Sequence, residues 1–404
     1  MKKVLFINEQ YPLPENCGAN IRTMLFVNFL KKIAAIDLVY TQKNNFTQIN
    51  NAIFRKTFYI PRSDHPFTAG QHCKLILQKF PWCIRARHSK KYSCSISSIL
   101  QNTNYDLIFI RYPFNAQYFL RMPSHIRSKV ILDFDDLISG SLYSLMFSVN
   151  TKYALKRWLD YQLAISYEQK CCSKLGRVLF CSKKDLEKRS YNRFSNTFVI
   201  PNIINPAVYN NFDFGDGYSA GNNFLFVGSL DYDVNIEGLI WFIKNIFTQF
   251  KNKYKDTLFF VVGRNPKEGI KKILLNTKGV ELHTNVADIL PFYAKTKLVV
   301  VPLLKGSGTR IKILEAALTG RPVLSTPVGA EGLDLKDNKE VLIFNDLNSF
   351  VINFIKLQNK KIYNDIVYRA KATTMAKYSI NNFNSALKSV LSSFKLSDYR
   401  STNS

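Results

Sequence analysis

Short apolar runs of three to five residues recur along this chain, each followed by a polar loop and a stretch with helical spacing. Such continuous apolar runs are typical of strands buried on both faces of a parallel sheet, because helices cover both faces of that sheet. Strands that alternate with helices predict an α/β fold. In the first half of the chain, the expected strands are 4–7, 37–40, 107–110, 130–132, 178–180 and 198–200.

The pattern begins again after a polar stretch at 205–223, which we interpret as a linker. The expected strands of the second half are 224–227, 258–262, 280–283, 298–301 and 323–325. Helices are expected at 21–33, 236–250, 310–319 and 380–394. Because 404 residues are many for one core, we predict two Rossmann-like domains whose parallel sheets face each other across a cleft. The predicted parts are a domain at 1–200, a domain at 201–375, and a C-terminal helix and tail at 376–404 that pack back on the first domain.

The chain is strongly basic, with a formal net charge of +27, and residues 1–200 hold 30 basic and 12 acidic side chains. Such a surface attracts anionic membranes, acidic ligands or nucleic acid, and a solvated basic surface without a partner is the plain alternative. Nucleic acid is not expected, because no nucleic-acid module is recognisable. Aromatic residues mixed with the basic ones suit an anionic membrane interface. These aromatic residues are Phe54, Phe58, Tyr59, Phe67, Phe80 and Trp82.

Cysteine usage and hydropathy bear on the compartment. The seven cysteines are scattered without CxxC pairs, which argues against a disulfide framework or a zinc site and indicates a reducing cytosol. The five histidines show no metal-ligand spacing, so no metal is expected. The apolar run at 4–7 is too short for a signal peptide, and no window is apolar enough to span a bilayer. We therefore expect a cytoplasmic protein whose membrane contact, if any, is peripheral at the inner face.

In open parallel sheets, ligands bind outside the carboxyl ends of the strands. In the second half, four strand ends lead into small, flexible or cationic residues, among them Gly228, Ser229 and Arg264. Four such ends in register predict a binding site, although Arg264 is also readily explained as a simple surface arginine. The stretch after the strand at 298–301 is the most informative, because it opens a helix whose free N–H groups favour a phosphate. Its residues are Gly306, Ser307, Gly308, Thr309, Arg310 and Lys312.

Within the helix expected at 310–319, a polar stripe is predicted that faces the cleft. Its members are Gly308, Lys312, Glu315 and Thr319. The seven residues from Gly308 to Glu315 span about 10 Å of helix rise, which matches the distance from a diphosphate to a ribose. A carboxylate at Glu315 could accept hydrogen bonds from two ribose hydroxyls. The alternative is an ordinary helix residue that is either solvated or in a salt bridge, for example with Lys312.

The strand at 130–132 ends in an acidic turn that contains Asp135. A carboxylate there could orient or deprotonate an acceptor hydroxyl, whereas the equally weighted alternative is capping of the following helix by Asp135 or Asp136. Arg111 ends the strand at 107–110 and either reaches the cleft or takes part in structural pairing. The residues leave these alternatives open.

Residues 306–333 resemble the donor-binding segment of the group-1 glycosyltransferases, which are retaining enzymes of the GT-B fold. Residues 226–235 are similar to that family too, as are 167–168, 181–185 and 199–202. The N-terminal segment 11–14 with Gly18, Asn20 and Arg22 resembles the first glycine-bearing loop of the family.

The resemblance implies that the second domain binds a nucleotide-diphosphate sugar and the first domain binds the acceptor. Glu315 would bind the donor ribose, while Arg310, Lys312 and the amides of 307–309 would hold the diphosphate. Asn285 and Val286 would lie against the base. The acceptor side would include Gly18, Asn20, Arg22 and Arg111, with Asp135 at the cleft. The implied chemistry is metal-independent, and positive groups stabilise the leaving diphosphate.

Two positions depart from the family. Ser307 stands where many members carry a second Glu, and Ser229 stands where many have Arg, so the choice of sugar is left open. We predict a retaining, hexosyltransferase-type enzyme that needs no cofactor. It acts on a glycan or lipid-linked acceptor in surface polysaccharide synthesis. The alternatives are a non-catalytic nucleotide-binding scaffold protein and a nucleotide-sugar epimerase on the same fold.

Overall fold

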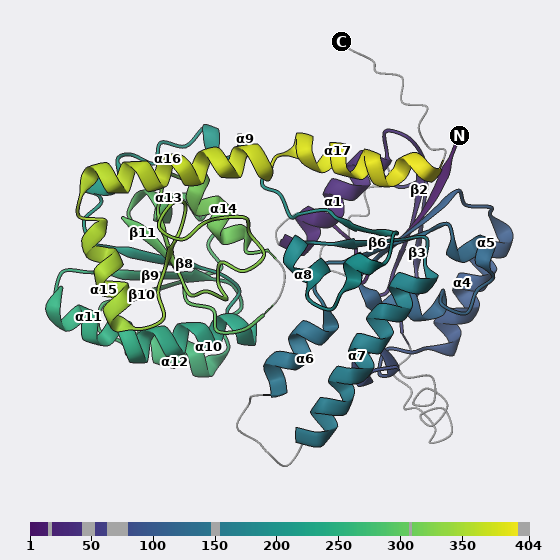
Figure 1. Cartoon of the computed structure of the whole chain (residues 1–404), viewed down its shortest axis with the longest axis horizontal. Coiled ribbons are helices and arrows are strands. Elements are labelled where there is room, and N and C mark those ends of the chain that lie inside the picture. The colour runs from purple at the N-terminus through teal and green to yellow at the C-terminus, as the bar shows by residue number, and fades with distance from the viewer. Residues whose placement is uncertain (15–17, 43–52, 63–79, 147–153, 307–308, 395–404) are drawn as a thin grey trace, which may run out of the picture. The chain divides into compact units, whose positions relative to one another are not determined.

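A computed structural model describes residues 1–394 except 15–17, 43–52, 63–79, 147–153 and 307–308 (Figure 1). The described chain forms two compact units. Unit 1 comprises Met1–Pro201 with Asn384–Ser404, and unit 2 comprises Asn202–Phe383. The C-terminal helix α17 (Ile380–Leu391) therefore begins in unit 2 and ends in unit 1.

Unit 1 is built on a parallel sheet with the strand order β3-β2-β1-β4-β5-β6-β7. All six predicted strands are present, and the short β3 was missed because its residues are polar or half-buried. The strands are β1 (Lys3–Ile7), β2 (Ala35–Tyr40), β3 (Lys56–Tyr59), β4 (Leu107–Arg111), β5 (Val130–Phe134), β6 (Arg177–Phe180) and β7 (Thr197–Val199).

Helices cover both faces of this sheet (Figure 1), so β4 and β5 are buried along their whole length. The helices are α1 (Gly18–Leu30), α3 (Trp82–Arg85), α4 (Lys90–Asn102), α5 (Ser124–Arg127), α6 (Ile138–Met146), α7 (Ala154–Lys174) and α8 (Lys183–Glu187). Short 3₁₀ turns are η1 (Pro113–Tyr118), η3 (Tyr191–Arg193) and η6 (Ser392–Phe394).

Unit 2 holds a second parallel sheet with the order β10-β9-β8-β11-β12-β13. All five predicted strands are present, and the two-residue β13 was missed because it is too short to form a recognisable run. The strands are β8 (Phe224–Val227), β9 (Phe259–Gly263), β10 (Val280–Thr284), β11 (Leu298–Val301), β12 (Val323–Ser325) and β13 (Leu342–Ile343). The prediction of an α/β fold with two parallel sheets is thus confirmed.

The helices of unit 2 lie around its sheet (Figure 1). They are α9 (Ala207–Asn210), α10 (Asp233–Phe242), α11 (Thr248–Lys253), α12 (Glu268–Leu275), α13 (Leu290–Ala294), α14 (Ile311–Leu318), α15 (Leu347–Lys356) and α16 (Lys360–Lys377), with a 3₁₀ turn η4 (Gly217–Ser219). The predicted helix at 236–250 is continuous but includes the π-helical turn η5 (Ile243–Phe247). Its apolar side chains pack into the core, where Ile246, Phe247 and Phe250 are buried.

The interpretation of 205–223 as a linker was wrong. This stretch contains α9 and η4 and belongs to unit 2. Its backbone and side chains are held by hydrogen bonds, since Arg321 donates to the Phe214 carbonyl and the Tyr218 hydroxyl donates to the Gln358 carbonyl at 2.6 Å. A polar segment without apolar runs can therefore be an integral part of a folded unit.

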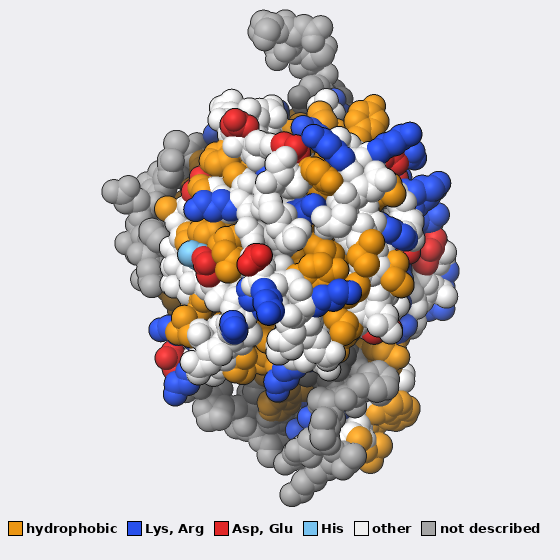
Figure 2. Space-filling model, turned by 90° about the vertical axis from the view of Figure 1, so that its left-hand side faces the viewer, with side chains coloured by type: hydrophobic (Ala, Val, Ile, Leu, Met, Phe, Trp, Pro, Cys, Tyr) orange, Lys and Arg blue, Asp and Glu red, His pale blue; other side chains and the backbone are white. Residues whose placement is uncertain are grey.

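Figure 2 shows one face of the molecule, on which lysine and arginine side chains are spread among apolar, acidic and uncharged ones. No single basic patch dominates that face. Among the described residues, no helix combines the length and the apolar character needed to cross a bilayer.

Candidate functional site

Each sheet reverses its strand order at one point, between β1 and β4 in unit 1 and between β8 and β11 in unit 2. In doubly wound sheets, ligands bind at such points, outside the carboxyl ends of the strands. The loops after β8 and β11 therefore frame the candidate donor site of unit 2. They contain Gly228 and Ser229 after β8, and 302–310 after β11.

Gly228 lets two side chains approach the backbone closely. A Cβ at this position would lie 2.9 Å from Nδ2 of Asn235 and 3.0 Å from Nζ of Lys312. Asn235, in α10, donates to the Ser229 carbonyl at 2.9 Å and accepts from Lys312 Nζ at 3.1 Å. The Lys312 ammonium thus lies at the end of β8, beside the glycine.

The position of Lys312 is electrostatically costly. Burial, reinforced by the charge of Arg310, lowers the pKa of Lys312 to about 7, although Glu315 opposes the shift. The ammonium also lies 4.3 Å from the centre of the Phe226 ring, a favourable cation–π geometry. A bound anion would stabilise the charged form of Lys312 and raise its pKa again, so these surroundings favour an anionic ligand.

Glu315 lies one turn further along α14 and accepts two tyrosine hydrogen bonds. The Tyr209 hydroxyl donates to Oε1 and the Tyr293 hydroxyl donates to Oε2, both at 3.3 Å. Burial raises the pKa of Glu315, and the two hydroxyls and Lys312 oppose that shift. A carboxylate has about four acceptor positions, so two remain for further donors.

The predicted helix start needs correction. Helix α14 begins at Ile311, one residue later than predicted, and Arg310 is its N-cap residue. Thr319 is buried and donates to the Ala316 carbonyl at 3.0 Å, so the predicted polar stripe wrongly included it. Ser307 and Gly308 lie outside the described residues.

Gly306 has a φ of +116°, which favours glycine, and an added Cβ would lie 2.8 Å from Nη2 of Arg310. The Arg310 guanidinium therefore folds back against this loop. The side chain of Thr309 is buried, and its hydroxyl has no hydrogen-bond partner among the described residues.

The loops after β8, β9 and β10 are linked by hydrogen bonds. The Leu230 amide donates to the Arg264 carbonyl at 2.8 Å, and the Asn265 amide donates to Oδ1 of Asn285 at 3.1 Å. The Ser229 hydroxyl donates to Asp231 at 2.6 Å, and Val286 is half-buried against the core. Four predicted donor residues, Ser229, Arg264, Asn285 and Val286, therefore lie in adjacent loops at one edge of the sheet.

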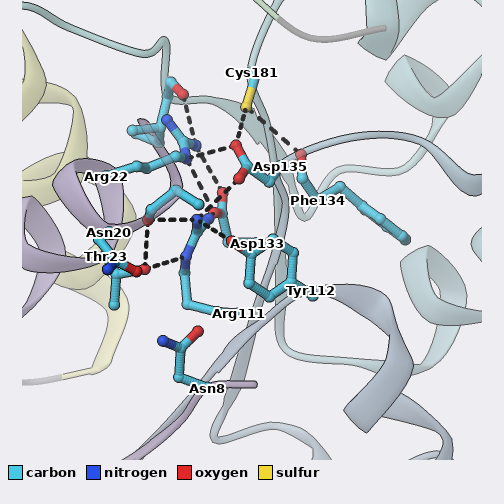
Figure 3. Close-up of polar contacts among 12 residues, drawn as sticks. Asn8, Asn20, Arg22, Thr23, Arg111, Tyr112, Asp133, Phe134, Asp135 and Cys181 are labelled. Atoms are coloured by element: carbon cyan, nitrogen blue, oxygen red, sulfur yellow. Dashed lines mark hydrogen bonds and ion pairs between the residues drawn. The ribbon is translucent and has the colours of Figure 1, made fainter. Parts of the chain in front are cut away.

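In unit 1, two arginines and two aspartates form a cluster at the ends of β4 and β5 (Figure 3). Arg111 and Asp133 are register partners on the neighbouring strands β4 and β5, and they form an ion pair. Arg22, from α1, donates to both carboxylate oxygens of Asp133, at 2.7 and 3.0 Å. Arg22, Arg111 and Asp133 are all buried, so this is the structural pairing that the sequence left open for Arg111.

Asp135 is the more accessible carboxylate of this cluster. It accepts from Arg111 Nη2 at 3.0 Å and from the Cys181 thiol at 3.6 Å (Figure 3). Burial would raise the pKa of Asp135, but the guanidinium groups of Arg111 and Arg22 hold it below its usual range. Helix α6 begins at Ile138, and its first turn bonds to Glu168, whose Oε1 accepts from the Ser139 amide at 2.9 Å.

The other predicted residues of unit 1 shape the start of α1. Gly18 is its first residue, and Asn20 donates to the Pro14 carbonyl at 2.8 Å and accepts from Gln10 at 2.7 Å. Asn20 is thus engaged in holding the preceding loop.

The sequence analysis did not identify Tyr209 or Tyr293, and it assigned no individual role to Asp133 in the acidic turn or to Asn235 in the segment 226–235. Asp133 and Asn235 lie inside segments already marked by strand ends, so the strand pattern could have indicated them. Tyr209 lies in the stretch that we interpreted as a linker, and nothing in its neighbourhood pointed to Glu315.

Comparison with known proteins identifies similar sequences and folds. Residues 221–360 match the family model described as Glycosyl transferases group 1. An uncharacterized 44.6 kDa protein in the cps region of Klebsiella pneumoniae is 23% identical over 374 residues, which is 88% of this chain and 92% of that protein.

Two solved structures show the extent of the fold similarity. Sucrose-phosphate synthase from Thermosynechococcus elongatus has a TM-score of 0.67 at 14% identity and covers 97% of this chain and 99% of its own. The Anabaena protein HepE, in complex with UDP and glucose, has a TM-score of 0.62 at 14% identity and covers 97% of this chain and 100% of its own. The chain therefore has the GT-B fold, and its residues 221–360 are similar to the group 1 glycosyltransferases.

Proposed function

We propose that this protein is a glycosyltransferase that moves a sugar from a nucleotide-diphosphate sugar to a hydroxyl of a glycan or lipid-linked acceptor. The observation that carries the proposal is the arrangement of Lys312 and Glu315 on α14, next to the loop after β8. One supplies a cation that favours an anionic ligand, and the other supplies a carboxylate already oriented by two hydroxyls. The structure of HepE with UDP and glucose supports this class of donor.

In this proposal the diphosphate lies at Lys312, Arg310 and the amide groups that precede α14. Positive charge held in place before the reaction stabilises the negative charge that develops on the leaving diphosphate. This charge would serve in place of a metal ion, and the anomeric configuration would be retained. Glu315 would accept hydrogen bonds from the donor ribose, while Asn285 and Val286 would lie against the base.

On the acceptor side, we assign an orienting role to Asp135. Because Arg111 and Arg22 lower its pKa, this carboxylate is a weak base at neutral pH. It is better suited to accept a hydrogen bond from the acceptor hydroxyl than to remove its proton. In this scheme the departing phosphate takes that proton.

We further propose that the reaction belongs to surface polysaccharide synthesis at the cytoplasmic face of the membrane. The similarity to a protein in a cps region of Klebsiella pneumoniae supports this assignment.

The first test is a thermal-shift screen against UDP, GDP, ADP and CMP and their sugars. A ligand present at about a hundred times its Kd adds roughly 2.7 kcal/mol to the free energy of unfolding. We expect one nucleotide class to stabilise the wild type and not Glu315→Ala, whereas Glu268→Ala, an exposed residue of α12, keeps the effect. The absence of any nucleotide effect would refute the donor site.

A transfer assay then separates the alternatives. Product formed from a radiolabelled donor in the presence of EDTA would agree with a metal-independent enzyme. An NMR spectrum that shows the donor's anomeric configuration in the product would agree with a retaining enzyme. Tight nucleotide binding without transfer across a broad acceptor panel would favour a scaffold protein. Conversion of the donor sugar without any acceptor would favour an epimerase.

A further inference from the structure

Helix α7 carries two apolar stripes. One, which includes Ala164, Tyr167 and Cys171, is buried in the core of unit 1. The other consists of Leu155, Trp158 and Leu159, whose exposed fractions are 71%, 45% and 48%. The spacing i, i+3, i+4 puts these three side chains on one helix face, opposite the buried stripe. An apolar stripe on a helix is normally buried against a core. We therefore infer that the second stripe binds a partner outside the described residues.

Aromatic side chains border this stripe on both sides. Trp82, from α3, is 48% exposed, and its backbone amide donates to Oδ1 of Asp160 in α7 at 3.0 Å. Tyr143, from α6, is 45% exposed and its ring lies 5.7 Å from that of Tyr161 in α7. We call the five residues Trp82, Tyr143, Leu155, Trp158 and Leu159 the α7 face.

The charge around the α7 face is positive. The acidic residues of α6 and α7 are Asp160 and Glu168, and both are buried. Asp160 is paired with Arg85 at 3.6 Å, and Glu168 accepts from the Ser139 amide and the Tyr191 hydroxyl. Lys156 remains exposed, with its ammonium 5.6 Å from the Trp82 ring. The accessible charges on the described part of these helices are therefore all basic.

A surface that combines Trp and Tyr with Leu and has lysine at its edge is typical of proteins that bind at a membrane–water interface. Figure 1 shows α6 and α7 side by side, with the N-terminal end of α7 extending beyond the sheet of unit 1. We propose that the α7 face docks on the surface of an anionic lipid bilayer. The proposal deepens the proposed function and rests on it for its purpose, because a lipid-linked acceptor would be presented at that surface.

This location differs from the one that the sequence indicated. Of the aromatic residues mixed with basic ones in 51–100, Phe54 and Phe80 are buried in the core. Phe58 is half-buried, and Phe67 lies outside the described residues. Tyr59 and Trp82 are exposed, and Trp82 alone belongs to the α7 face.

The test is sedimentation of the full chain with vesicles at low salt. The vesicles contain phosphatidylcholine, either alone or with about a third phosphatidylglycerol, and no glycan or nucleotide. We expect binding to the anionic vesicles, weakened by salt, and at least about a tenfold loss of affinity for the triple variant Leu155→Ser, Trp158→Ser, Leu159→Ser. The double variant Ile352→Ser, Ile355→Ser, which changes exposed apolar residues of α15, should bind like the wild type.

A second readout reports on the contact itself. The chain has three tryptophans, so Trp82→Phe with Trp241→Phe leaves Trp158 as the single indole emitter. Its fluorescence should shift to shorter wavelength with anionic vesicles, and Lys156→Glu should weaken the binding that produces the shift.

Three results would overturn the proposal. In the first, the wild type does not bind anionic vesicles. In the second, the triple variant binds them as tightly as the wild type does. In the third, the wild type forms a dimer that does not bind vesicles, and the triple variant is a monomer. The last result would make a second copy of the chain the occupant. Because the vesicles hold no donor or acceptor, failure here leaves nucleotide binding intact, and failure of the nucleotide screen leaves vesicle binding intact.

Discussion

The Tyr293 hydroxyl donates a hydrogen bond to Oε2 of Glu315 at 3.3 Å, from a completely buried position in α13. The Tyr209 hydroxyl approaches the other carboxylate oxygen at the same distance. The two phenols thus hold the carboxylate in one orientation.

Replacing Tyr293 by Phe should therefore weaken nucleotide binding as well as the fold. Loss of one hydrogen bond to a buried carboxylate costs about 1–3 kcal/mol in the free energy of unfolding, and we expect about a tenfold rise in the Kd of the nucleotide identified in the screen. Urea unfolding and isothermal titration measure the two effects.

The matched control is Tyr363→Phe, since the Tyr363 hydroxyl donates to the backbone carbonyl of Lys297 at 2.8 Å. This variant should lose about 1 kcal/mol of stability with an unchanged nucleotide Kd. Equal changes in Kd for both variants would show that Tyr293 acts on stability alone.

Lys312 should make nucleotide binding depend on pH. Its pKa is lowered to about 7, and a bound diphosphate raises it again, so binding takes up a proton above pH 7. The affinity should fall as the pH rises from about 7 to 9, where the phosphates are already ionised, by up to about tenfold per pH unit. Isothermal titration of Lys312→Met should give weaker binding with a flat pH dependence.

The same group has the opposite effect on folding. The pKa of Lys312 in the folded state lies below that in the unfolded chain, so its contribution to the free energy of unfolding rises from about pH 7 to about pH 10.5. Lys267→Met, which removes an exposed partner of Asp233, should keep the wild-type slopes in both measurements. A wild-type affinity that is constant over this pH range would contradict the assignment.

Asp133→Asn should destabilise unit 1 strongly. Asp133 is buried and pairs with both Arg22 and Arg111, so the variant leaves two buried guanidinium groups undercompensated. Breaking such a pair costs about 3–5 kcal/mol. Denaturant unfolding measures the loss, and Asp106→Asn, in an exposed pair with Lys2, should cost at most about 1 kcal/mol. Similar losses in the two variants would argue against the cluster as a stabilising element.

Gly228→Ala should disturb the donor site without unfolding unit 2. The added methyl group would lie 2.9 Å from Asn235 and 3.0 Å from Lys312, and both side-chain ends have to move. We expect about a tenfold loss of nucleotide affinity with a stability change below about 2 kcal/mol. Gly269→Ala is the matched control, because its Cβ meets nothing within 4 Å in α12, and it should stabilise the protein by up to about 1 kcal/mol. Unchanged nucleotide affinity in Gly228→Ala would place the ligand elsewhere.

Local pattern determined most of the architecture. The apolar runs at 107–110 and 298–301 predicted β4 and β11, because strands buried on both faces need continuous apolar residues. The glycine and cationic residues after the runs at 224–227 and 298–301 marked the edge of the sheet in unit 2 where the candidate donor site lies. The strand β13 escaped prediction, since two residues cannot show a periodicity.

Tertiary structure decided which side chains meet. Tyr209 reaches Glu315 across 106 residues from a stretch that reads as a linker, and Arg22 reaches Asp133 across 111 residues. Such pairs depend on how separate helices and strands pack together, and this packing cannot be predicted from residue spacing along the chain. Burial likewise determines the pKa of Lys312, because the same lysine on an exposed helix would keep its ordinary value.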